Sequence, residues 1–178
     1  LMVFANFVLS LASSLKTMTG RTHFMRANAS FRDKHRGQTG FLVANGPSIN
    51  EQNLSLLVGS ICFFVNQSFR HPEYAAIAPA YHVIIDDKLC SGVWDIKWLD
   101  EILKLNPEVT FLLNAKWYND KKFQSYRRDE RYKIVWIDCR KFFHKYMGSS
   151  SIDLTKTAPG VAVTGAAFTA MIFMGFKT

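Results

Sequence analysis

One run of residues carries the strongest local signal for chemistry, Val-Ala-Asn-Gly-Pro-Ser-Ile at residues 43–49. Gly46 lets a ligand approach the backbone closely, and Pro47 fixes the turn. Ser48 can cap a following helix, whose first backbone amides would face an anion. The run lacks the lysine of a Walker loop and the spacing of a full G-x-G-x-x-G fingerprint. It therefore favours a phosphate or nucleotide site, with a purely structural turn as the alternative.

An Asn or Asp follows each of five short apolar runs along the chain. The runs cover residues 41–44, 60–65, 81–85, 109–113 and 133–137, and they are followed by Asn45, Asn66, Asp86, Asn114 and Asp138. In a parallel sheet the carboxyl ends of the strands share one edge, and ligands bind beyond that edge. Asn and Asp are also common turn and capping residues, which explains Asn114 and Asp138. We expect the other three to converge on one crevice.

These side chains need an alternating fold to position them. The apolar runs have the length and composition of strands, and helical segments separate them, which indicates βαβ units and a mostly parallel sheet. The clearest helix spans Asp95 to Leu105 and ends at Asn106-Pro107. Residues 121–131 are rich in charge and are expected to form a solvated helix or loop. The sequence therefore predicts the α/β class.

The N-terminal segment is apolar. Residues 1–15 have no charge, but they fall short of the roughly 20 residues that a transmembrane helix needs, and they lack the basic start of a signal peptide. We expect a helix that packs on the domain or lies at a membrane surface. Because the first residue is Leu1 and not Met, we also expect the chain to begin inside a longer reading frame. Residues 1–36 are thus interpreted as an apolar helix and a basic linker before the domain at 37–178.

A second apolar segment, Ala158 to Phe176, is long enough to span a bilayer. Pro159, Gly160 and Gly165 break its first half. A helix buried against a parallel sheet is also apolar nearly all round. The buried helix is the favoured interpretation, and the membrane span is the alternative.

Composition limits the class of protein. The 178 residues allow one domain, and 48% hydrophobic with 20% charged residues excludes a disordered chain. The net charge of +8 favours an anionic partner, which can be a nucleotide, a nucleic acid or a membrane surface. The chain has three well-separated cysteines, Cys62, Cys90 and Cys139. Their number and spacing predict free thiols in a reducing compartment rather than a disulfide or a zinc site.

Several blocks of the sequence resemble a known family. Three blocks look like the MptE-like Rossmann proteins: Lys34–Asn50 (KHRGQTGFLVANGPSIN), Phe64–Phe69 (FVNQSF) and His82–Asp87 (HVIIDD). Members of that family often occur among surface-polysaccharide genes. The chain is also similar to the bacterial lipooligosaccharide sialyltransferases, whose G-N-G-P-S-L and C-N-Q-F-Y segments correspond to Ala44–Ile49 and Val65–Phe69. Thr164–Thr178 resembles the family's T-S-G/T-G-G helix and L-G-Y-K-T segment. The resemblance implies a Rossmann-like three-layer sandwich and supports the buried helix.

The resemblance also implies a nucleotide site. The Asn-Gly-Pro-Ser turn would contact the nucleotide, and the Asn-Gln pair would hold the ribose, phosphate or sugar of the donor. The helix start at 164–165 would face the same pocket, and Asp86 would bind the ribose, the acceptor or a metal. The implied nucleotide- and donor-binding residues are Asn45, Gly46, Pro47, Ser48, Asn66, Gln67, Asp86, Thr164 and Gly165. No catalytic residue and no dedicated metal site is assigned.

The chain departs from the family in two places. Ala44 stands where the family usually has Gly, which adds a methyl group close to the ligand. The sequence also ends at Thr178, where the family continues with a strand and, in the sialyltransferases, with a later His that serves as general base. None of the five histidines matches that His, and His82 is expected in the core or at a sheet edge. We therefore expect a fragment, truncated at its C-terminal end, that binds a nucleotide better than it turns one over.

Three functions compete. The first is a glycosyltransferase-like domain that uses a nucleotide sugar, CMP-linked by the resemblance, in bacterial surface polysaccharide synthesis. The second is an MptE-like pyrophosphokinase of the 6-hydroxymethylpterin diphosphokinase type, which needs ATP and Mg²⁺ and would rely on Asp86 and Asp87. The third is a basic nucleic-acid or membrane-surface module, because cations and aromatics alternate in KKFQSYRR at 121–128.

The first function is favoured, and it sets the expected partners. These are a nucleotide sugar, with a CMP-sugar preferred, and a glycan acceptor, with no nucleic acid. Mg²⁺ is a cofactor only under the second function. The expected location is the cytoplasm. Peripheral contact with the inner membrane and a homo-oligomeric state are both open alternatives.

Overall fold

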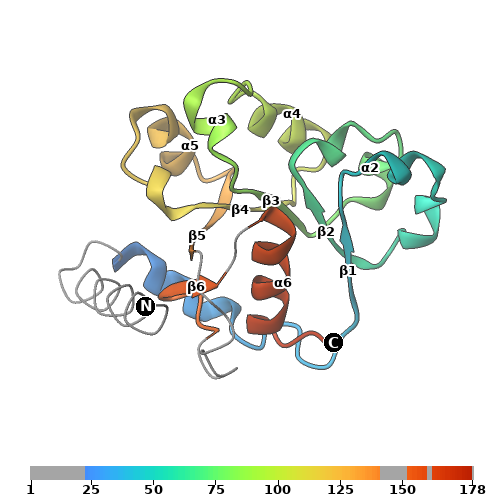
Figure 1. Cartoon of the computed structure of the whole chain (residues 1–178), viewed down its shortest axis with the longest axis horizontal. Coiled ribbons are helices and arrows are strands. Elements are labelled where there is room, and N and C mark those ends of the chain that lie inside the picture. Colours follow the sequence, from blue (N-terminus) through green and yellow to red (C-terminus); the bar gives the residue numbers. More distant parts are fainter. Residues whose placement is uncertain (1–22, 141–151, 160–161, 178) are drawn as a thin grey trace, which may run out of the picture.

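Six parallel strands form the sheet in the part of the chain that the computed structural model describes, residues 23–140, 152–159 and 162–177. The strands are β1 (Gly40–Val43), β2 (Ile61–Val65), β3 (Tyr81–Ile84), β4 (Thr110–Asn114), β5 (Lys133–Arg140) and β6 (Thr157–Pro159). Their order in the sheet is their order in the chain, β1-β2-β3-β4-β5-β6 (Figure 1). The first five begin within one residue of the expected positions, and the predicted Rossmann-like α/β class is confirmed.

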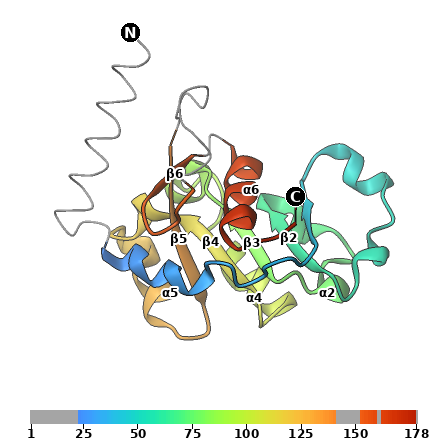
Figure 2. The same cartoon turned by 90° about the horizontal axis from the view of Figure 1, so that it is seen from below.

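Helical segments cover both faces of the sheet and make a three-layer sandwich. One layer contains α2 (Tyr74–Ile77), α3 (Asp87–Ser91), α4 (Trp98–Leu105), α5 (Gln124–Arg128) and the short 3₁₀ helices η2 (Pro47–Glu51), η3 (Leu54–Leu57), η4 (Asn66–Arg70), η5 (Ala115–Trp117) and η6 (Lys121–Phe123). The other face is covered by α6 (Val163–Phe173), as Figure 1 shows. Seen from below in Figure 2, α6 crosses the sheet near β2 and β3.

The connections from β1 to β5 all pass over the layer that contains α2 to α5. Crossover connections between parallel strands are right-handed, so connections on one face move the chain steadily in one direction across the sheet. In the doubly wound sheet that is built from two mononucleotide-binding halves, the strand order reverses in the middle of the sheet, and the ligand binds at that point. The described strands show no such reversal, so any crevice at their carboxyl ends has to be formed by the loops themselves.

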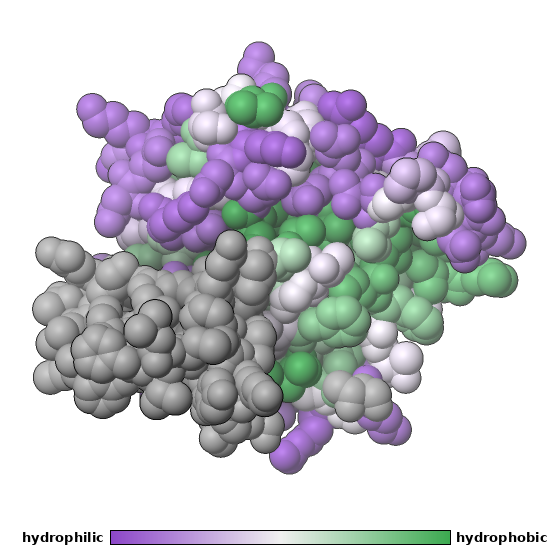
Figure 3. All heavy atoms as spheres, in the orientation of Figure 1, coloured by the Kyte–Doolittle hydropathy of each residue, from purple (hydrophilic) through white to green (hydrophobic). Residues whose placement is uncertain are grey.

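Helix α6 is the buried helix that the sequence favours. Its small residues Ala166, Ala167 and Ala170 are fully buried against β1, β2 and β3. No helix of the described residues is long and apolar enough to cross a membrane. The outer face of α6 leaves Phe168 and Ile172 exposed, and Figure 3 shows hydrophobic side chains gathered over this part of the surface, below a mostly hydrophilic helical layer.

The basic stretch before β1 is partly helical, and two of its residues are anchored in the core. Its described part contains η1 (His23–Phe31), in which Met25 and Asn28 are buried. The Asn28 side-chain amide donates to the backbone carbonyls of Trp136 (2.8 Å) and Leu154 (2.7 Å). It thereby satisfies a carbonyl of β5. Residues 1–22, including the expected apolar helix, lie outside the described part.

Two of the three cysteines have described side chains, and both are free thiols as expected. Cys62 is fully buried in β2, and burial raises the pKa of its thiol to about 11. A thiol with such a pKa stays protonated and unreactive at neutral pH. Cys62 is therefore a core residue.

The C-terminal end of α6 is hydrogen-bonded to the segment that precedes β1. Backbone amides of residues 33, 35 and 37 donate to the carbonyls of Phe173, Met174 and Gly175, at 3.1, 2.8 and 2.9 Å. A Cβ atom at Gly40 would lie 2.7 Å from the Phe176 ring and 2.9 Å from Met171 Cε. Close approach of helix and strand therefore requires glycine at position 40. Helix α6 runs antiparallel to the strands, with its first turn toward their carboxyl ends.

We expect Gly40→Ala to lower the free energy of unfolding by about 1–3 kcal/mol, because the added methyl group overpacks the contact between β1 and α6. Urea unfolding measures the change. Gly46→Ala is the matched control, since its added Cβ would meet only Ser48 Oγ at 3.9 Å and its φ of −69° suits any residue. Equal effects of the two substitutions would contradict the packing account.

Candidate functional site

A polar cavity of about 210 Å³ lies at the carboxyl ends of β1 and β2. Two segments form this cavity. The first is the loop after β1 together with helix η2, and the second is helix η4 together with the residues that follow it. The lining residues are Asn45, Ile49, Asn50, Gln67, Ser68, Arg70, His71 and Pro72. The structure therefore brings together Asn45 and Gln67, which the sequence predicts in one site.

The turn after β1 differs from the expected helix cap. Ser48 does not cap η2; Gly46 takes the N-cap position without a side-chain bond, and the amide of Ile49 donates to its carbonyl at 3.0 Å. Gly46, Pro47 and Ser48 are all exposed. Neither the backbone angles of Gly46 nor any contact of a Cβ there demands glycine. Glycine is a common N-cap residue, and it would also let a ligand approach the backbone closely.

The turn after β2 is held in a strained conformation. Asn66 has a φ of +49°, in the left-handed region that non-glycine residues rarely adopt. Ser68 closes the turn, since its hydroxyl donates to the carbonyl of Val65 (2.8 Å) and accepts from the amide of Val65 (2.9 Å). The Asn66 side chain is 8% exposed, and its Oδ1 has no hydrogen-bond partner among the described residues. Strained residues cluster at active sites and ligand clamps, and an unsatisfied buried polar atom needs an explanation such as an ion or water.

A buried histidine supports this turn. His82 Nε2 lies 2.9 Å from the backbone carbonyl of Asn66, and its Nδ1 lies 3.0 Å from the hydroxyl of Tyr74. Burial lowers the pKa of His82 to about 4, against the opposing effect of the bond to Asn66. The ring is therefore neutral at pH 7; because a carbonyl can only accept, Nε2 carries the proton and Nδ1 accepts from Tyr74. His82 is a core residue, as expected.

Arg70 is a site residue that the sequence analysis missed. Its guanidinium packs over the rings of Phe69 and Trp98, 5.7 and 5.3 Å from their centroids. No carboxylate of the described residues forms an ion pair with it. The available signal was its position, because Arg70 directly follows the Val65–Phe69 block. An exposed, oriented guanidinium of this kind suits phosphate or carboxylate.

The acidic residues after β3 do not line this cavity. Asp86 instead caps α3 by accepting from the amide of Lys88 at 3.0 Å. Asp87 accepts from Lys116 and from Trp117 Nε1 (3.3 Å), and the bond from Lys116 lowers the pKa of its carboxyl. The described residues include no group of three or more Asp, Glu, His or Cys side chains placed to hold a metal.

The first turn of α6 also lies outside the cavity. Thr164 and Gly165 are half-buried on the face of the sheet that α6 covers. Ile49 of the cavity packs on the core of the opposite face. The sheet therefore separates the two groups, although both are near its carboxyl edge. Asn114 has the turn role expected for it, with Nδ2 donating to the carbonyl of Ile85 at 3.2 Å and Oδ1 accepting from the next helix.

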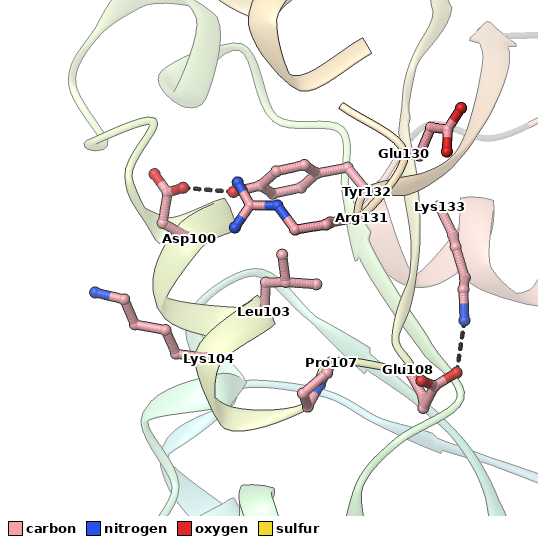
Figure 4. A pocket seen from close by; sticks show the side chains of 9 residues that line it. All are labelled: Asp100, Leu103, Lys104, Pro107, Glu108, Glu130, Arg131, Tyr132 and Lys133. Atoms are coloured by element: carbon pink, nitrogen blue, oxygen red, sulfur yellow. Dashed lines mark hydrogen bonds and ion pairs between the residues drawn. The ribbon is translucent and has the colours of Figure 1, made fainter. Parts of the chain in front are cut away.

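Two larger hollows lie elsewhere. The first, of about 460 Å³, sits at the amino ends of β4 and β5, away from Asn45; Figure 4 shows its lining residues Asp100, Leu103, Lys104, Pro107, Glu108, Glu130, Arg131, Tyr132 and Lys133. Its polar groups are largely paired, with the Tyr132 hydroxyl on Asp100 and Lys133 on Glu108. The second, of about 520 Å³, lies between α2 and α4 and shares Arg70, His71 and Pro72 with the polar cavity.

The fold and cavity define a parallel α/β domain with a polar site at the carboxyl ends of its first two strands. No family model, curated protein or solved structure matches the chain. Assignment of a function therefore depends on the chemistry of the site.

The burial of His82 makes stability depend on pH. The unfolded chain binds a proton near pH 6.5 and the folded chain only near pH 4, so the stabilisation is complete above pH 6.5 and is lost as the pH falls toward 4. We expect the free energy of unfolding to fall by about 3 kcal/mol more in the parent than in His82→Gln over this range. Urea unfolding at pH 7.5, 6, 5 and 4 measures the difference. Parallel curves would contradict it.

The strain at Asn66 predicts an unusual substitution. We expect Asn66→Gly to raise the free energy of unfolding by about 1 kcal/mol, because glycine adopts a positive φ without strain and removes the unpaired Oδ1. Thermal and urea unfolding measure the effect. A marked loss of stability would show instead that the Asn66 side chain has a structural partner.

Proposed function

We propose that this chain is a nucleotide-binding domain of the glycosyltransferase kind, with a CMP-linked sugar as its preferred donor. The observation that carries the proposal is the cavity that Asn45 and Gln67 share, although they lie in separate blocks of the sequence. Arg70 lines the same cavity and has no ion-pair partner among the described residues. Each of the three offers a group that recognises part of a nucleotide.

Arg70 would bind the phosphate, because a planar guanidinium matches two phosphate oxygens. The amides of Asn45 and Gln67 would bind ribose or sugar hydroxyls. The cavity, at about 210 Å³, is smaller than the roughly 300–1,000 Å³ that encloses a drug-sized ligand. It therefore suits the phosphate and its neighbouring sugar, with the rest of the ligand along the exposed turn at 44–48.

Glycosyl transfer from such a donor leaves negative charge on the departing nucleotide phosphate. Arg70 is placed to stabilise this charge in the transition state. The reaction also needs a base to deprotonate the acceptor hydroxyl. His71 lines the cavity, but its Nδ1 accepts from the amide of Glu73 at 3.3 Å, so the neutral ring offers a donor and no free lone pair. We assign no catalytic base.

The other two functions receive less support. A pyrophosphokinase needs carboxylates that converge on Mg²⁺, whereas Asp86 caps a helix and Asp87 is bonded to Lys116 and Trp117. A single-strand-binding module needs exposed aromatics, whereas Phe123 is fully buried and Tyr126 donates to Asp100 at 2.8 Å. The aromatic residues of KKFQSYRR therefore pack inward, Arg127 is bonded to the Tyr118 carbonyl, and Lys121, Lys122 and Arg128 are exposed.

A thermal-shift series tests the proposal, with CMP, CMP-sialic acid, UDP, GDP and ATP, each with and without Mg²⁺. At 100 times its Kd a ligand stabilises the folded chain by about 2.7 kcal/mol, which corresponds to about 5–10 °C for a domain of this size. We expect such a shift from CMP without metal. We expect Arg70→Gln to weaken binding at least tenfold, since it loses a charge-assisted bond worth about 1.5–3 kcal/mol.

Controls separate the site from general charge. Arg128→Gln removes an exposed cation of α5 and should bind as the parent does. Gly46→Ala should keep its stability but bind more weakly, because its methyl group would enter the ligand's space. A shift from ATP only with Mg²⁺ would favour the pyrophosphokinase, and no shift from any nucleotide would overturn the proposal.

A further inference from the structure

We propose that His82 and Tyr74 are positioning residues, a buried hydrogen-bonded pair that fixes the Asn66–Gln67 peptide in the orientation that binds the ligand. The proposal rests on the proposed function, because it concerns the same cavity. It goes further by naming residues outside the cavity lining and the backbone group that they present.

The pair forms a continuous chain from α2 to the end of β2. The Tyr74 hydroxyl donates to His82 Nδ1 (3.0 Å), and His82 Nε2 donates to the Asn66 carbonyl (2.9 Å). Both side chains are 0% exposed. His82 lies opposite Phe64 in the register of β2 and β3, so its ring reaches the strand end beyond Val65. The rings of Phe69 and Tyr74 meet the imidazole edge-on, with centroids 6.1 and 5.7 Å away.

Core packing alone does not account for an imidazole here. The other residues of β3 are Tyr81, Val83 and Ile84, and all are buried. A Leu or Phe at position 82 would fill the space without removing a polar ring from water. The imidazole is compensated by its two hydrogen bonds, and one of them goes to the carbonyl of the residue with the strained backbone.

The bond to the Asn66 carbonyl fixes a donor as well. A trans peptide group is planar, so the amide N–H of Gln67 points opposite to the carbonyl of Asn66. With that carbonyl directed at the buried His82, the N–H is directed away from it. Without the bond the Asn66–Gln67 peptide could rotate about the Asn66 Cα–C bond, and the Gln67 amide would change direction. The geometry thus presents a backbone donor for an anionic oxygen, next to the cavity that Gln67 and Arg70 line.

The test compares His82→Leu, His82→Gln and Tyr74→Phe by calorimetric titration with CMP. We expect His82→Leu to bind at least tenfold more weakly. His82→Gln should stay within about threefold of the parent, because its amide can still donate to the Asn66 carbonyl. Tyr74→Phe keeps that bond and should lose about threefold. Parental affinity in His82→Leu would overturn the proposal.

Val83→Ala is the control for general loosening, because Val83 is equally buried in β3 but faces the core beneath α6. It should bind CMP as the parent does under conditions in which every variant is folded. A loss equal to that of His82→Leu would overturn the positioning role, because it would show that any destabilisation of β3 weakens binding.

A second readout does not depend on the nucleotide. The ¹⁵N shifts of the His82 ring in the parent should identify the Nε2–H tautomer, with a proton protected from exchange. In His82→Leu the backbone shifts of Asn66 and the amide shift of Gln67 should change, because the peptide between them loses its fixed direction. An Nδ1–H tautomer, or unchanged Asn66 shifts, would overturn the proposal. If the parent bound no nucleotide while both spectra matched, the proposed function would fail and the control of the turn by His82 would stand.

Discussion

Burial of both faces of a parallel sheet is the constraint on which the rest of this structure depends. A parallel sheet needs a cover on each side, so its strands are apolar along their whole length and its polar groups collect at the strand ends. Strands β2 and β4 follow this rule closely, with nearly every residue buried. The same constraint makes α6 apolar nearly all round, because the sheet lies beneath it. Polar chemistry is therefore restricted to the edges of the sheet, and Asn45 and Asn66 stand at the carboxyl edge.

This constraint explains which parts of the fold could be predicted from the sequence. Apolar runs mark buried strands directly, so five strands were placed correctly. The segments between them are short and mostly 3₁₀, and their ends depend on tertiary contacts that no periodicity records. The segment at η1 has a basic, polar composition, yet Asn28 is buried because it satisfies carbonyls of Trp136 and Leu154. Its partners lie more than a hundred residues away in the chain, beyond the reach of any local pattern.

The sequence grouped the candidate site residues for a related reason. A strand end indicates the edge of the sheet but not the face, so Asn45 and Gln67 line one cavity, whereas Thr164 lies on the other side of the sheet. Asp86 does not line the cavity, and its carboxylate caps α3, a role that an Asp at a strand end can equally have. Arg70 was missed because its one sequence signal, its position directly after the Val65–Phe69 block, says nothing of where the side chain lies. Only the fold shows that it stacks on Trp98 and faces the cavity.

The distribution of unfavourable features strengthens the argument for a binding site. A chain under selection for stability alone would place Gly at position 66, where φ is positive, and an apolar residue at position 82, where an imidazole is wholly buried. Strain of this kind costs about 1–3 kcal/mol. Both features concern Asn66, whose carbonyl accepts the bond from His82. Asn66 directly precedes Gln67 of the cavity, in which Arg70 has no acidic partner among the described residues. Packing explains none of these three features separately, whereas an anionic ligand bound beside Gln67 would account for all of them.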